Sequence, residues 1–256
     1  CPSCGAEELL RVGTGTETLE DALRTTFPTA RIGRLDRDSA EEDGAFVALE
    51  QMRKRELDVL VGTQMITKGH DLPGVALVGV VLADQSLAFP DFRAGERTFQ
   101  LIAQVAGRAG RADVAGRVIV QCFEPTVPAI VCATKHDYLA FYESERPMRR
   151  DHVMPPFGRL AAVRIDAGDE RESERIAGVL ADVAMAHPAV KSMQVAVLGP
   201  VRSPIARARG RYRFRFLIRG LERGPVRAVA KAVIARIEQG IEPARASVDI
   251  DPVSML

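Results

Sequence analysis

Two arginines spaced three residues apart, Arg108 and Arg111, follow a stretch with helical periodicity that begins near Arg93. They end the segment Gln104-Val-Ala-Gly-Arg-Ala-Gly-Arg111. A planar guanidinium donates two hydrogen bonds to a phosphate, and two such groups at one helix end can reach the same γ-phosphate. Arginines in this role accelerate phosphoryl transfer by about 10³ to 10⁵. The alternative is a helix end with glycine caps, where arginines compensate the helix dipole.

A segment rich in hydrogen-bond donors follows a short apolar run at 58–61 that predicts a buried strand. Hydroxyl, amide and ammonium groups suit a phosphodiester backbone, and glycine permits its close approach. Sheets of parallel strands carry their ligand loops at this end of a strand. The residues predicted to contact nucleic acid here are Thr63, Gln64, Thr67, Lys68 and Gly69.

The chain begins with a pair of cysteines, Cys1 and Cys4, in the sequence Cys-Pro-Ser-Cys-Gly. This knuckle is typical of sites that present two thiolates to one tetrahedral zinc ion. No second Cys-x-x-Cys or histidine pair follows, so a zinc ion would need ligands from further upstream. A chance pair and a redox dithiol are the alternatives. The opening residues lead us to expect that the natural protein continues upstream.

The window from Arg202 to Arg245 contains twelve basic and three acidic residues, a net charge of +9, and is a candidate surface for a polyanion. Within it, arginines alternate with Tyr, Phe and Ile residues, and a period of two sends them to opposite faces of a strand. We expect the apolar residues to pack in a core. The arginines predicted to form a DNA-binding stripe are Arg209, Arg211, Arg213 and Arg215. The alternative is an ordinary amphipathic strand with a charged outer face.

Residues 9–131 alternate apolar strands with amphipathic helices, which indicates a parallel sheet covered on both faces and looks like a RecA-type lobe. A helical connector and a Pro-Pro bend follow. The order then becomes strand, helix, strand, strand, helix, strand, typical of a ferredoxin-like module. Its strands are expected at 160–165, 193–198, 211–219 and 246–250, and its helices at 170–186 and 225–239. The chain is therefore expected to be α/β with two domains.

Composition excludes several classes of protein. With 46% hydrophobic and 27% charged residues, and no run of 18 apolar residues, neither a membrane span nor a signal peptide is expected. A cytoplasmic protein without disulfides is the expectation, with Cys122 and Cys132 as small core residues. The phosphate loop Gly-x-x-x-x-Gly-Lys-Ser/Thr and an Asp-Glu-x-His sequence are both missing, so this stretch alone is not expected to hydrolyse ATP.

The string from Asp84 to Gln100, DQSLAFPDFRAGERTFQ, runs directly into the arginine segment. Together they resemble the PriA (primosomal protein N′) family of replication-restart DNA helicases, in superfamily 2. The segments 13–17, 34–38 and 249–252 extend the resemblance along nearly the whole chain.

The resemblance implies a role for each motif. Arg108 and Arg111 would be arginine fingers, with Gln104 and Gly107 close to the nucleotide, and 63–69 would line the path of single-stranded DNA. Cys1 and Cys4 would be the last two ligands of a Zn²⁺ site, and ATP and Mg²⁺ would bind mainly through an upstream lobe. Residues 1–8 would end the zinc-binding insertion, 9–148 would form the second helicase lobe and connector, and 149–256 a C-terminal DNA- and partner-binding domain.

The resemblance also implies a function for the full-length protein: an ATP-dependent 3′-5′ DNA helicase that recognises stalled or abandoned replication forks and initiates primosome assembly. Expected partners are forked and single-stranded DNA, the single-stranded DNA-binding protein and other primosome proteins, in the bacterial cytoplasm at the nucleoid. A fork-binding scaffold without motor activity is the alternative if the upstream phosphate loop is degraded. A helicase of another branch would share the arginine motif but not the string from Asp84 to Gln100.

Overall fold

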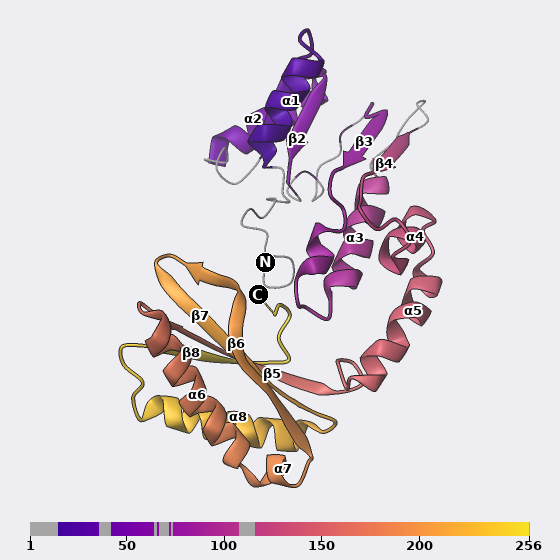
Figure 1. Ribbon diagram of the computed structural model, residues 1–256. Helices are drawn as coiled ribbons and strands as arrows, with labels where there is room; N and C mark the ends of the chain where they lie inside the picture. The colour runs from indigo at the N-terminus through magenta and orange to yellow at the C-terminus, as the bar shows by residue number, and fades with distance from the viewer. Residues whose placement is uncertain are drawn as a thin grey trace, which may run out of the picture. The chain divides into compact units, whose positions relative to one another are not determined.

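The computed structural model describes residues 15–35, 42–63, 66, 72, 74–107 and 116–255. They divide into two compact units (Figure 1). The first includes the chain up to Ser86 and residues 96–137, and the second includes residues 87–95 and the chain from Tyr138 onward. The boundary predicted between 148 and 149 lies inside a helix of the second unit. Residues 87–95 join that unit because their contacts are with its strands and C-terminal tail.

The first unit alternates helices and short parallel strands, as the periodicity predicts. Leu35 lies opposite Gly62 in one strand pair, and Val80 lies opposite Val120 in the other. Among the described residues the strands form two separate two-stranded sheets, whereas the sequence predicted one sheet. The elements are α1 (Thr16–Thr26), β1 (Ile32–Leu35), α2 (Glu42–Arg53), β2 (Val59–Gly62), β3 (Leu77–Val80), η2 (Gln85–Ala88), α3 (Ala94–Ala106), β4 (Arg117–Val120) and α4 (Pro128–Thr134).

An ion pair joins the residues that precede β1 and β2. The Arg31 guanidinium donates to both carboxylate oxygens of Asp58, at 2.7 and 3.0 Å, and the Arg31 backbone N–H donates to the same carboxylate at 2.8 Å. These hydrogen bonds to the charged form lower the pKa of Asp58 to about 2. The pair therefore fixes the register at which the two parallel strands begin.

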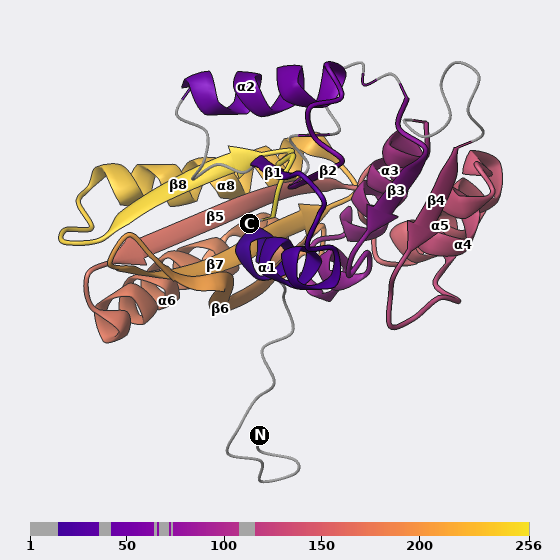
Figure 2. The same ribbon diagram turned by 90° about the horizontal axis from the view of Figure 1, so that it is seen from above.

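The second unit is a four-stranded antiparallel sheet in the order β6-β7-β5-β8 (Figure 2). Its element order agrees with the predicted strand, helix, strand, strand, helix, strand, with one short helix added. The α/β class with a parallel and then an antiparallel part is thus confirmed. The elements are α5 (Tyr138–Asp151), β5 (Arg159–Ala167), α6 (Glu170–Ala186), α7 (Pro188–Lys191), β6 (Val195–Ala208), β7 (Arg211–Gly220), α8 (Arg223–Glu238) and β8 (Arg245–Ile250).

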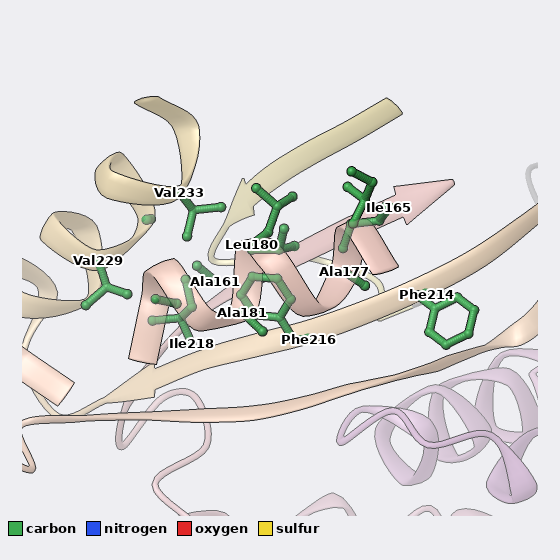
Figure 3. Packing of buried hydrophobic residues seen from close by; sticks show 14 of the residues in the cluster. Ala161, Ile165, Ala177, Leu180, Ala181, Phe214, Phe216, Ile218, Val229 and Val233 are labelled. Atoms are coloured by element: carbon green, nitrogen blue, oxygen red, sulfur yellow. The ribbon is translucent and has the colours of Figure 1, made fainter. Parts of the chain in front are cut away.

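Alternate residues of β5 and β7 build the core of this unit. Val163 lies opposite Phe216 in the antiparallel ladder, and both are fully buried. Apolar side chains of α6 and α8, including Leu180 and Val229, pack against the same face of the sheet (Figure 3). Because successive residues of a strand point to opposite faces, the residues between these apolar ones lie on the other face of the sheet. Several of them are arginines. No helix in the described part of the chain is long and apolar enough to cross a membrane.

We expect Phe216→Ala to lower the free energy of unfolding of the second unit by about 3 to 5 kcal/mol, because it leaves a cavity in a fully packed core. Met193→Ala is the control, since Met193 is 91% exposed and its truncation should change stability by about 0.5 kcal/mol or less. Chemical denaturation of both variants measures the difference. Equal losses would contradict the assignment of this core.

Candidate nucleotide and nucleic-acid sites

Thr63 lies where the sequence places a ligand loop, directly after β2. Its backbone N–H donates to the carbonyl of Leu35 at 3.3 Å, so the ends of both strands meet at one edge. A Cβ added at Gly62 would collide with that same carbonyl oxygen, so only glycine fits here. The Thr63 side chain is exposed. The other predicted contacts of this segment, Gln64, Thr67, Lys68 and Gly69, lie outside the described residues.

The helix that precedes the arginine segment is α3. Phe99, Ile102 and Val105 are buried at spacings of three, so one face of the helix packs inward. Gln104 lies on the opposite face and is exposed, and Gly107 is exposed just after the last turn. The structure thus leaves the two predicted nucleotide neighbours accessible. Arg108 and Arg111 lie outside the described residues, and their role stays a prediction.

The candidate zinc ligands, Cys1 and Cys4, also lie outside the described residues. Of the two other cysteines, Cys132 is buried in α4 and Cys122 is half-buried after β4, and both are free thiols. Within the described ranges no group of three or more His, Cys, Asp or Glu side chains is arranged to hold a metal ion.

The predicted arginine stripe has a different structure at each of its four positions. Arg209 is in the turn between β6 and β7, not in a strand, because Arg209 and Gly210 both have positive φ, 51° and 75°. This two-residue conformation matches the twist of a hairpin. Arg211 is bound to the carboxylate of Asp166 and donates to the Asp166 carbonyl at 2.9 Å. The arginine side chains are therefore not one open row.

Arg215 is the largest departure from the expected stripe. Only 6% of its surface is exposed, and its guanidinium donates to the carbonyls of Met255 and, at 3.0 Å, Pro90. Desolvation lowers the pKa of Arg215, partly opposed by the nearby carboxylate of Asp91. A side chain closed off in this way is not available to a phosphate. The prediction failed because residues distant in sequence cover the sheet at this point.

The C-terminal tail is the covering element. Arg164 donates to the carbonyl of Ser254, Arg215 to that of Met255, and Arg93 to that of Pro252 at 3.0 Å. Two arginines of the sheet, Arg164 and Arg215, thus bind backbone carbonyls of their own chain. A cavity of about 140 Å³ remains beside the tail, and the side chains of Arg213 and Ser203 are among those that line it.

Exposed basic residues are found elsewhere on the second unit. Arg223, Arg227 and Lys231 follow at intervals of four on α8, so they lie along one side of the helix, and all three are exposed. Like charges at this spacing repel each other and destabilise a helix slightly. Such a row is favoured when an anionic partner neutralises it. The spacing i, i+4, i+8 in the sequence already indicated this basic row. The prediction of a DNA-binding stripe missed it because that prediction rested on the period of two that is typical of strands.

Comparison with known families gives two matches that follow the two halves of the chain. Residues 10–113 match the helicase conserved C-terminal domain, and residues 150–253 match the primosomal protein N C-terminal domain. The first match includes Thr63, α3 and the arginine segment. The second includes the whole antiparallel sheet with α6 and α8.

Curated relatives match over most or all of the chain. The replication restart protein PriA of Bacillus subtilis is 38% identical over 100% of this chain and 32% of its own length. Those of Synechocystis and Haemophilus influenzae are 40% and 37% identical over 81% and 82% of this chain, and 25% and 28% of their own. The chain therefore spans about a third or less of these relatives. With both domain types present in the same order, the chain belongs to the PriA family of replication restart proteins.

Proposed function

We propose that this chain is part of an ATP-dependent 3′-5′ DNA helicase that acts at stalled or abandoned replication forks and initiates primosome assembly. The observation that carries the proposal is the continuous string from Asp84 to Arg111, which lies within a helicase-domain match beside relatives named as replication restart proteins. In this proposal the single-stranded DNA-binding protein and other primosome proteins are its partners.

The chain's own residues have three proposed tasks. Arg108 and Arg111 stabilise the charge that develops on the transferred phosphoryl group, with Gln104 and Gly107 beside the nucleotide. ATP and Mg²⁺ bind mainly to residues outside this chain, because its sequence has no phosphate loop. Thr63 and the segment up to Gly69 hold the DNA backbone.

Fork-stimulated ATP hydrolysis by the full-length protein tests the motor. Arg108→Ala and Arg111→Ala should each reduce the turnover rate by about 10³ or more, because each removes a cation from the transition state. Arg175→Ala, an exposed residue of α6 paired with Glu172, is the control and should keep the wild-type rate. Equal rates in all variants would contradict the finger assignment. A wild-type protein that binds forks without any turnover would favour the scaffold function instead.

Binding of DNA to the second unit is proposed to use accessible cations rather than buried ones. Arg209 at the hairpin turn, Arg213 beside the cavity and the α8 row of Arg223, Arg227 and Lys231 are accessible to a phosphate backbone. The bound state of Arg211 and the burial of Arg215 make these two side chains structural in this proposal.

The salt dependence of fork binding tests whether the accessible cations of α8 contact DNA. Replacing Arg223, Arg227 and Lys231 with Gln should reduce the slope of log affinity against log salt by about 0.7 to 0.9 for each phosphate that the variant no longer neutralises. Fluorescence anisotropy on a forked oligonucleotide, over a series of salt concentrations, measures the slope. Arg175→Gln is the matched control. An unchanged slope in the triple variant would rule out the α8 row as a DNA contact.

We further propose that Cys1 and Cys4 bind Zn²⁺ together with two ligands outside this chain. Metal analysis of the full-length protein should show that Cys1→Ser loses one bound zinc ion, because serine is a far poorer ligand than thiolate. Cys122→Ser, which changes a free half-buried thiol, should keep it. Unchanged zinc content in Cys1→Ser would end this assignment.

A further inference from the structure

The residues just before α3 are fixed to the C-terminal unit, although they come early in the chain. Asp91 is 8% exposed, and its carboxylate accepts hydrogen bonds from two backbone N–H groups, that of Arg93 at 3.0 Å and that of Met255 at 3.2 Å. The backbone carbonyl of Asp91 accepts from Ala94, the first residue of α3, at 2.9 Å. Asp91 thus ties the start of the helix to the C-terminal tail.

Arg215 makes the complementary connection from the sheet. Its guanidinium contacts the residue before Asp91, through the carbonyl of Pro90, and the residue that Asp91 itself binds, through the carbonyl of Met255. Asp91, Arg215 and Met255 therefore form a closed, buried arrangement in which each member constrains the other two. Removal of one partner from a buried charged arrangement leaves the other charge uncompensated, which costs far more than the loss of a surface pair.

Neighbouring contacts stiffen the same point. The Phe92 ring lies 4.9 Å from the Arg93 guanidinium and 5.4 Å from that of Arg149 on α5. A Cβ at Gly95 would lie 2.9 Å from the carboxylate of Glu145, so the first turn of α3 packs closely on α5. The amino-terminal end of α3, up to Gly95, is thus held within the second unit.

Helix α3 is a continuous rod of about 20 Å that begins at this point and ends at Ala106. We propose that Asp91 and Arg215 are positioning residues that hold the start of α3 through the C-terminal tail, and so couple the C-terminal unit to the far end of the same helix, where Gln104 and Gly107 lie. This inference rests on the proposed motor function.

The experiment compares Asp91→Asn and Arg215→Gln in the full-length protein with Asp182→Asn and Arg175→Gln, which change exposed side chains of α6 in the same unit. Fork-stimulated ATP hydrolysis should fall at least tenfold in kcat in the first two variants, while KM for ATP and fork affinity change less than about twofold. The controls should keep wild-type kcat. A loss confined to fork affinity, or no loss at all, would overturn the proposal.

Hydrogen exchange read by mass spectrometry tests whether Asp91 and Arg215 hold α3, and it does not require ATP hydrolysis. Amides of 94–107 should exchange at least tenfold faster in Asp91→Asn and Arg215→Gln, while those of α6 keep their wild-type rates. Unchanged exchange in α3 would overturn the proposal, and so would faster exchange in α6 as well, because that indicates unfolding of the domain rather than a loss of coupling. If the wild-type protein shows no fork-dependent ATP hydrolysis, the proposed motor function fails. The exchange rates still show whether Asp91 and Arg215 hold α3.

Discussion

A guanidinium removed from water has to find acceptors inside the protein, and the arrangement of the second unit follows from how Arg215 meets this requirement. Its strand neighbours Phe214 and Phe216 point into the core between the sheet and the helices. The arginine must therefore point to the other face, away from α6 and α8. The C-terminal tail and Pro90 cover that face at Arg215 and supply the carbonyl groups. The tail is held in place by its hydrogen bond to Arg215, and Arg215 is buried because the tail covers it.

The same constraint explains how the positive charge of the window 202–245 is divided. Arg211 and Arg215 of β7 use their charge in internal hydrogen bonds, the first with Asp166 and the second with backbone carbonyls that cover the sheet. Residues at the hairpin turn and on the outer side of α8 lie away from this cover and keep their charge at the surface. Net charge counts both groups equally. Only the position of each side chain relative to the covering segments separates a structural arginine from one that can meet a partner.

Much of the fold could be predicted from periodicity, because periods of two and 3.6 record which face of an element is buried. The helix predicted at 170–186 is α6, and the strands predicted at 211–219 and 246–250 agree with β7 and β8 within one residue. The period could not reveal what covers the polar face of β7, since Pro90 and Met255 lie 125 and 40 residues away from Arg215. Short α4 and α7 were missed because seven and four residues give too few turns to show a helical period. Of the site, the position of Thr63 follows from the end of β2, and that of Gln104 follows from the helical period of α3.

The non-contiguous composition of the second unit bears on how such a domain can be inherited. A gene segment that begins at residue 150 would encode the sheet and both of its helices, yet it would lack Pro90 and Asp91, which lie against the buried Arg215. Recombination at the apparent boundary would therefore deliver a domain with an uncompensated charge on one face. The second unit includes the segment that begins α3, so a chimaera between relatives keeps these contacts only if it exchanges residues 87–95 together with the sheet.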